Sequence, residues 1–128
     1  QMVRADFTYV GIRVRDMEQS IEFYTKVLGM KLAGKTRIEK TKGEAANLQS
    51  QDGGFQLELN HYDSDSPHNV PYVVGEGLDH LAFKVDSLDD TLRQAEALGY
   101  PMKLEINAES SRWAYIEDPN GIWIELFA

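Results

Sequence analysis

The chain has 128 residues, of which 42% are hydrophobic and 27% charged, as is typical of one globular domain with a single core. Thirteen Lys and Arg against 21 Asp and Glu give a net charge of −8, which disfavours nucleic acids and anionic membrane surfaces as partners. The absence of cysteine excludes disulfides, thiolate metal sites and cysteine nucleophiles. No apolar run reaches the ~18 residues of a membrane span, and no basic-then-apolar start resembles a signal peptide, so we expect a cytoplasmic protein.

Two helices are indicated by their end signals. Asp16 can cap a helix over 17–28, and Ser87 can cap a helix over 88–98; Gly29 and Gly99 would end them. Apolar residues recur three and four positions apart in both: Met17, Ile21, Tyr24 and Leu28, then Leu88, Leu92, Ala95 and Leu98. This spacing predicts two amphipathic helices.

The sequence around the first helix is repeated around the second. Residues 9–32 align with 80–104, and both stretches are typical of a strand, a capped helix, a glycine and a new strand. Residues 51–59 align with 118–126, and both are a glycine turn that leads into a strand with Glu at the same place. The chain is therefore predicted to contain two copies of one unit of roughly 60 residues, too few for a solenoid.

The duplication predicts the architecture. We expect one domain over 1–128, with a βαβββ repeat at about 5–62, a linker at about 63–76 and a second βαβββ repeat at about 77–128. Two such repeats predict an α+β fold. Its strands would form one curved, mostly antiparallel eight-stranded sheet, with a helix from each repeat on the outer face.

Four strands alternate apolar residues with polar or aromatic ones. The predicted buried face carries Val10, Ile12 and Val14, then Phe55, Leu57 and Leu59, then Leu81, Phe83 and Val85, and finally Ile122, Ile124 and Leu126. The repeat places Tyr9 where the second copy has His80, and Glu58 where it has Glu125. A sheet curved away from the helices would gather these four side chains in one cleft.

An imidazole and two carboxylates suit one divalent metal ion, with Ni, Zn, Co, Mn and Fe as candidates. A metal would also offset the cost of burying Glu125 between two aromatic rings. Other interpretations stay open: His80 as a structural histidine, Glu58 facing solvent, and Glu125 paired with a nearby cation, namely Arg13, Lys84 or Arg112. Trp113, Tyr115, Trp123 and Phe127 fit either the core or the walls of an apolar pocket.

At these residues the chain resembles the vicinal oxygen chelate superfamily, which includes glyoxalase I, bleomycin-resistance proteins and extradiol dioxygenases. The stretches "SIEFYTKVLGMKL", "LDHLAFKVDSLDD" and "EDPNGIWIEL" are most similar to bacterial glyoxalase I, the lactoylglutathione lyase. The resemblance covers essentially the whole chain. It implies four metal ligands, His, Glu, His and Glu, of which Glu58, His80 and Glu125 match the last three, while Tyr9 stands in the first position.

The resemblance implies a metal-dependent lyase or isomerase that stabilises an enediolate of a vicinal-oxygen substrate. Glu125 or Glu58 would then be the catalytic carboxylate that moves a proton between adjacent carbons. The expected substrate-binding residues are Tyr9, Arg13, Trp113, Tyr115, Trp123 and Phe127. Arg13 matches an arginine that the family uses on the peptide carboxylate. Tyr62 replaces an expected asparagine, however, and "NAESS" replaces an expected Lys-Gly loop, which disfavours a standard glutathione hemithioacetal.

Two other functions remain open. One is a small-molecule or drug-sequestering protein of the bleomycin-resistance type, without catalysis, in which Glu58 and Glu125 attract a cationic ligand. The other is an epimerase acting on an acyl-thioester. Because family members often pair so that two chains complete the cleft, the resemblance also implies a homodimer. The sequence leaves open whether Glu58 and His80 meet within one chain or across two.

Overall fold

The computed structural model describes residue 4 and residues 6–128. Residues 1–3 lie outside the described part, as does residue 5, where the first repeat was expected to begin. The elements in chain order are β1 (Val10–Arg13), α1 (Met17–Glu22), the π-helical turn η1 (Phe23–Val27), β2 (Lys31–Ile38), the 3₁₀ turn η2 (Glu39–Thr41), β3 (Gly43–Gln49), β4 (Gln56–Tyr62), β5 (His80–Lys84), α2 (Leu88–Ala97), β6 (Leu104–Ala108), β7 (Ser111–Glu117) and β8 (Trp123–Phe127). None of the helices in this described part is long and apolar enough to cross a membrane.

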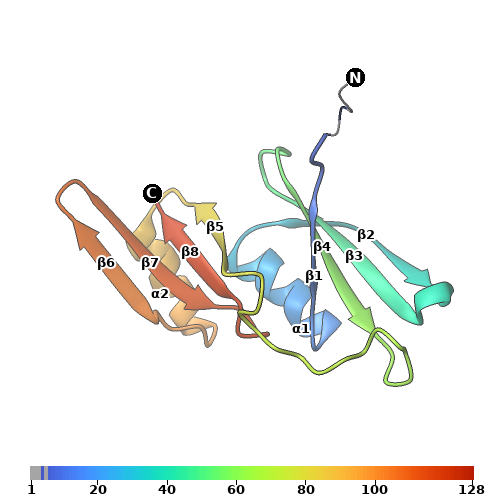
Figure 1. The fold of residues 1–128 in the computed structure, drawn as a ribbon. Coiled ribbons are helices and arrows are strands. Elements are labelled where there is room, and N and C mark those ends of the chain that lie inside the picture. The colour runs from blue at the N-terminus through green and yellow to red at the C-terminus, as the bar shows by residue number, and fades with distance from the viewer. Residues whose placement is uncertain (1–3, 5) are drawn as a thin grey trace.

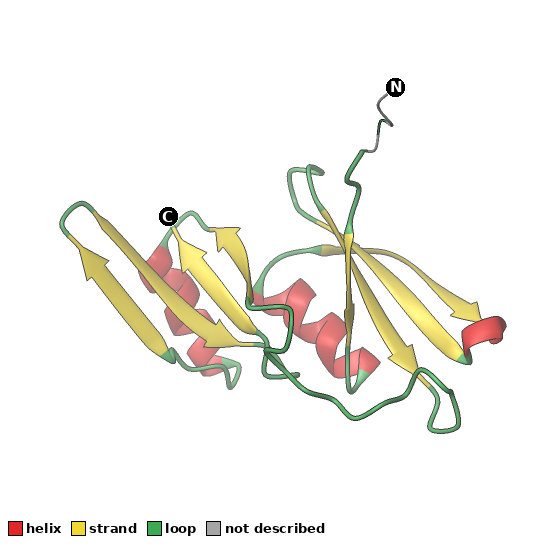
Figure 2. Cartoon of the chain, in the orientation of Figure 1, coloured by secondary structure: helices red, strands yellow, loops and turns green. Residues whose placement is uncertain are grey.

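The strands form two four-stranded sheets, ordered β1-β4-β3-β2 and β5-β8-β7-β6 (Figure 1). Within each sheet the first and last strands of the repeat pair in parallel, and the other pairs are antiparallel. The predicted α+β class and the two-repeat organisation are confirmed (Figure 2).

The sequence predicted one continuous sheet of eight strands, but the strands form two separate four-stranded sheets. Each sheet ends at a short strand, β1 or β5, that has one hydrogen-bonded neighbour. The alternation of side chains specifies the faces of a strand but carries no information about which edges pair. Part of the linker also lies against the end of β1, where Tyr72 donates a hydrogen bond to the carbonyl oxygen of Arg13 at 2.7 Å.

Strand register supports the equivalence of the repeats. Gly11 of β1 lies opposite Glu58 of β4, and Ala82 of β5 lies opposite Glu125 of β8. Tyr9 and His80 both precede these small residues by two positions, so they share the face of the neighbouring carboxylate. The two repeats therefore present equivalent pairs of side chains on the face opposite their helix.

Both helices begin as predicted. Asp16 accepts a hydrogen bond from the backbone N–H of Gln19 at 3.0 Å, and Ser87 accepts one from that of Asp90 at 3.2 Å. The first helix ends differently, because its last turn, η1, is π-helical. In this region the Thr25 hydroxyl donates a hydrogen bond to the Ile21 carbonyl oxygen at 2.7 Å. This hydrogen bond competes with the backbone hydrogen bonds of a regular α-helix.

One hydrophobic cluster takes residues from both repeats. Its buried members are Ile12, Val14, Met17, Phe23, Tyr24, Met30, Ala46, Leu48, Leu57, Leu59, Leu88, Ala95, Ala114, Ile116, Ile122, Ile124 and Leu126. Leu81, Phe83 and Val85 pack against it while partly buried. Phe55 was predicted to be buried, and this was wrong: it is 76% exposed, because β4 begins one residue later and Phe55 belongs to the turn.

A buried polar network joins the repeats. The carboxylate of Asp118 accepts hydrogen bonds from the Tyr24 hydroxyl at 2.7 Å and from the side chain of Asn120 at 2.9 Å. It also accepts from the backbone N–H groups of Asn120 and Ile122, both at 2.8 Å. Asn120 in turn donates to Ser20 on α1 at 3.2 Å. The β7–β8 turn of the second repeat is thereby bonded to the first helix.

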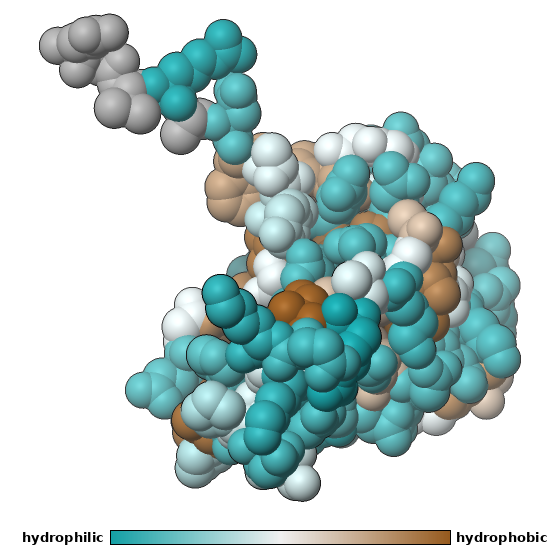
Figure 3. Space-filling model, turned by 90° about the vertical axis from the view of Figure 1, so that its right-hand side faces the viewer, coloured by the Kyte–Doolittle hydropathy of each residue, from teal (hydrophilic) through white to brown (hydrophobic). Residues whose placement is uncertain are grey.

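The described residues that precede β1 extend away from the body of the molecule (Figure 3). The face shown there is mostly hydrophilic, with small hydrophobic patches, as a chain of net charge −8 would be expected to present. Tyr9, the last residue before β1, is half exposed.

We expect Asp118→Asn to lower the free energy of unfolding by about 2–4 kcal/mol, because an amide must turn one N–H group toward donors that are already in place. Urea denaturation measures this. Asp86→Asn, at an exposed position, is the matched control and should stay near wild type. Equal stability of the two variants would show that the network does not join the repeats energetically.

Candidate functional site

The second sheet brings His80 and Glu125 together. Nε2 of His80 lies 3.6 Å from Oε1 of Glu125, and both side chains are partly buried. This separation is longer than a hydrogen bond. Two ligand atoms that are each about 2.1 Å from a metal lie about 3 to 3.5 Å apart, so the His80–Glu125 separation is close to that of two ligands of one ion.

His80 is oriented by a neighbour that the sequence analysis did not single out. Its Nδ1 lies 2.7 Å from Oδ2 of Asp79. A carboxylate at Nδ1 favours the tautomer with the proton there, which leaves Nε2 free to act as a ligand. The adjacent Asp-His pair in the sequence was the available signal, but only the structure shows which ring nitrogen it contacts.

Tyr115 of β7 holds Glu125 from the other side. Its hydroxyl donates a hydrogen bond to Oε1 of Glu125 at 3.0 Å. Burial raises the pKa of the Tyr115 phenol, and the hydrogen bond to Glu125 raises it further, so the phenol stays a neutral donor. The Tyr115 ring also contacts the rings of His80 and Trp123, with centroids 5.9 and 5.2 Å away. These contacts restrict the imidazole and the carboxylate together.

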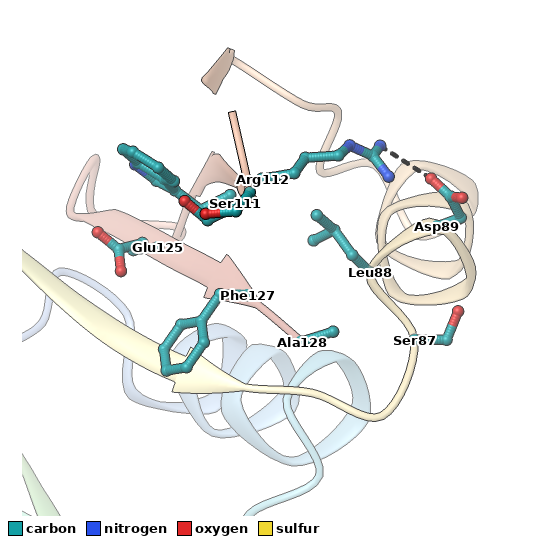
Figure 4. A pocket seen from close by; sticks show the side chains of 10 residues that line it. Ser87, Leu88, Asp89, Ser111, Arg112, Glu125, Phe127 and Ala128 are labelled. Carbon is teal, nitrogen blue, oxygen red and sulfur yellow. Dashed lines mark ion pairs between the residues drawn. The ribbon is translucent and has the colours of Figure 1, made fainter. Parts of the chain in front are cut away.

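A cavity of about 560 Å³ adjoins Glu125. Figure 4 shows Glu125 and Phe127 at its border, both from β8, and Arg112 paired with Asp89 at the start of α2. Trp113 also lines this cavity, whereas Tyr115 and Trp123 lie on the same face of the sheet outside its lining. Of the five aromatic residues predicted to bind substrate, the four in the second repeat therefore share one face, and two of these, Trp113 and Phe127, border the cavity.

The first sheet carries the other two expected site residues. Glu58 lies at the centre of β4, opposite Gly11 of β1 and Asn47 of β3. Tyr9 and Glu58 are related to each other as His80 and Glu125 are. Glu58 and Tyr9, the residue before β1, thus share one face at the first sheet, as Glu125 and His80 do at the second.

The described residues contain no group of three or more His, Asp or Glu side chains placed to hold a metal ion. Each sheet instead offers two donors: an imidazole and a carboxylate on the second, and a phenol and a carboxylate on the first. The imidazole–carboxylate pair fits a divalent metal by chemistry and separation. A phenol that keeps its proton is a weak metal ligand. Among the described residues, neither sheet alone therefore carries the three or four ligands that the resemblance implies.

Arg13 is held by the linker. Its Nη1 donates to the carbonyl oxygen of Val70 at 2.7 Å and lies 3.4 Å from that of His68. Its guanidinium also lies over the ring of Tyr72, 4.8 Å from the centroid. The side chain predicted to bind a substrate carboxylate therefore has linker backbone as its partner here.

The titration of Tyr115 tests this geometry. We expect its phenol to ionise above the usual pKa of about 10 and Glu125→Gln to lower that pKa, because the variant removes an anion that disfavours phenolate. The ¹³Cζ shift of Tyr115 followed against pH measures it. Glu58→Gln, on the other sheet, should leave the titration unchanged. An unchanged Tyr115 titration in Glu125→Gln would refute the contact.

The protein-family model described as Glyoxalase/Bleomycin resistance protein/Dioxygenase superfamily matches residues 6–126 of the chain. The chain is 37% identical to the uncharacterised protein YwbC of Bacillus subtilis, covering 93% of this chain and 94% of that one. It is 35% identical to a probable chloroplastic lactoylglutathione lyase of Arabidopsis thaliana, covering 92% of this chain but only 34% of that longer relative. The trypanothione-dependent glyoxalase I of Leishmania major is a structural neighbour, with a TM-score of 0.78, 25% identity and coverage of 96% and 86%. The chain belongs to the glyoxalase/bleomycin resistance/dioxygenase superfamily.

Proposed function

We propose that this protein is a metal-dependent lyase or isomerase of the glyoxalase I type, which moves a proton between two adjacent oxygen-bearing carbons. The observation that carries the proposal is the pair of His80 and Glu125, held 3.6 Å apart by Asp79 on one side and Tyr115 on the other. Relatives named lactoylglutathione lyase support the reaction class.

Glu58, His80 and Glu125 would hold one divalent ion, with Tyr9 beside them. When bound, the metal supplies electrostatic stabilisation of negative charge that develops on the substrate oxygens. The candidates remain Ni, Zn, Co, Mn and Fe.

The residues of this chain supply the remaining chemistry. Glu125 accepts the proton from one carbon and returns it to the next, while the Tyr115 hydroxyl limits the rotation of the carboxylate. Glu58 is the equivalent carboxylate on the other sheet and is the alternative proton carrier. Substrate would lie against Trp113, Tyr115, Trp123 and Phe127, whose rings exclude water from the reacting carbons.

We infer that two chains complete the site as a homodimer. Glu58 lies on the first sheet, His80 and Glu125 lie on the second, and the described residues of one chain do not join them. A second copy can place its first sheet against the second sheet of this chain. Each sheet ends at an edge strand, β1 or β5, that has a hydrogen-bonded neighbour on one side and lies next to the donor residues.

The proposal also concerns whether the substrate contains glutathione. Arg13 is positioned for a carboxylate only if it leaves the carbonyl oxygens of His68 and Val70. Tyr62 stands where an asparagine was expected. We therefore propose a vicinal-oxygen substrate whose thiol part differs from a standard glutathione adduct.

A second candidate is sequestration of a cationic small molecule without catalysis. It is favoured by the rings around Glu125, since aromatic faces and a carboxylate together attract cations. Trp113 and Trp123 are the two tryptophans of the chain, so quenching of their fluorescence would report either kind of ligand.

Metal content and isomerase activity test the proposal together. We expect wild-type protein purified without chelator to hold near-stoichiometric metal and to isomerise a methylglyoxal–thiol hemithioacetal. His80→Ala should lose both, because it removes the only neutral nitrogen donor in the proposed set. His68→Ala is the control and should retain both. Wild-type protein that stays metal-free after dialysis against Ni, Co, Zn and Mn would reject the lyase and favour sequestration.

Mixing two inactive variants tests the two-chain site. In a mixed dimer of Glu58→Gln and His80→Ala chains, one site carries both defects and the other carries neither. We expect the mixture, after exchange of chains, to regain metal and activity up to half of the wild-type level per mixed dimer. Glu58→Gln mixed with Glu58→Gln is the control. No recovery despite demonstrated exchange would place the donor set within one chain.

A further inference from the structure

The face of the first sheet that carries Glu58 is lined with side-chain amides. Asn47 of β3 lies directly opposite Glu58 of β4. Gln56 and Asn60 stand two residues before and after Glu58 on its strand, and Gln49 of β3 lies opposite Gln56. These four residues, the amide face, are exposed or half-buried, and their side chains form no hydrogen bond with the rest of the described chain. Their capacity to donate and accept hydrogen bonds is therefore open to a ligand.

Asparagine and glycine are unfavourable in strands, yet both occur in the interior of this sheet. One row of directly opposed residues crosses all four strands, from Gly34 of β2 through Asn47 and Glu58 to Gly11 of β1. The position that a Cβ atom at Gly34 would occupy has no neighbouring atom within 4 Å, and a Cβ atom at Gly11 would come within 3.0 Å of the Asn60 amide nitrogen. The two glycines leave room on both sides of Asn47 and Glu58 for a ligand to approach the backbone closely.

The second repeat has aromatic rings where the first repeat has amides. Tyr115 lies opposite Glu125, just as Asn47 lies opposite Glu58. The two residues that flank the carboxylate on its own strand also change, from amides on β4 to rings on β8. The repeats are therefore equivalent in fold but present faces of different chemistry, since amides form hydrogen bonds and rings offer apolar surface.

The amide face carries little charge. Lys31, opposite Gln49, stands at the corner of the sheet where β2 begins, and Arg13 donates to carbonyl oxygens of the linker. A ligand with free carboxylates would therefore meet no cation beside Glu58 and would be repelled by its charge. A carboxamide both donates and accepts, as a hydroxyl group does, so an uncharged ligand rich in hydroxyl groups satisfies this face without a counter-ion.

We propose that the amide face binds an uncharged, hydroxyl-rich group, a sugar ring or an open-chain polyol, as the non-reacting part of the substrate. The inference rests on the proposed function, in which the first sheet of one chain lies against the second sheet of another. A sugar ring has hydroxyl groups at its edge and C–H groups on its faces. It can therefore bond to the amides of one chain while it packs against the rings of the other, which an open-chain polyol does less well.

Titration of the full chain with methyl glucopyranoside, followed by the side-chain amide signals in NMR spectra, tests binding without any need for turnover. We expect saturable shifts at Asn47 and Gln56, and affinity lowered about fivefold in Asn47→Leu because a hydrogen bond is lost. Asn107→Leu, at an exposed position of β6, is the matched control and should bind as wild type does. Sorbitol is titrated in parallel: shifts with the sugar alone support a site for a sugar ring, and shifts with both support a site for any polyol. The absence of saturable shifts with either compound, or equal affinities of the two folded variants, would overturn the proposal.

Turnover separates this inference from the proposed function. The hemithioacetals of methylglyoxal with thioglucose and with mercaptopropionate share the same reacting carbons. In both, a proton leaves the carbon that bears sulfur and returns to the adjacent carbonyl carbon, so no oxidant is needed. We expect kcat/KM to be about tenfold higher for the thioglucose adduct, and Asn47→Leu, unlike Asn107→Leu, to reduce this ratio. Turnover of both adducts without preference would overturn the inference and leave the lyase in place, whereas sugar binding without any turnover would overturn the lyase and leave the sugar site in place.

Discussion

The Asp118 carboxylate is the polar contact on which the relation between the two repeats depends. An ionised carboxylate is costly to bury, and four donors from both repeats offset that cost. The contact fixes the turn that leads into β8, and β8 carries Glu125 seven residues later. The position of the candidate site is thus tied to the first helix, although no residue of that helix belongs to the site.

Local signals explain why so much of the fold could be predicted. Asp16 and Ser87 cap the helices as expected, and the period-two pattern identified the buried face of β8. Comparison of the chain with itself also aligned Glu58 with Glu125, which the strand registers support. These features depend on residues close together in sequence, where few conformations compete.

What the sequence did not reveal depends on longer-range geometry. The break between the sheets is decided by which strand edges pair, and Phe55 lies outside because its strand starts one residue late. Likewise, the composition of β7 identified Tyr115 as a candidate for the cleft but not as the hydrogen-bond donor to Glu125. The linker contact with Arg13 joins residues more than 50 positions apart, beyond the reach of any periodicity.

The separation of the donor pairs onto two sheets has a consequence for regulation. In the proposed two-chain site, each chain carries only part of the donor set on each sheet, so loading of an ion would be coupled to association of chains. Below the dissociation constant of the proposed dimer, the amount of loaded protein would rise with the square of the chain concentration. A modest change in expression would then change the amount of metal-loaded protein more than proportionally, without any effector molecule.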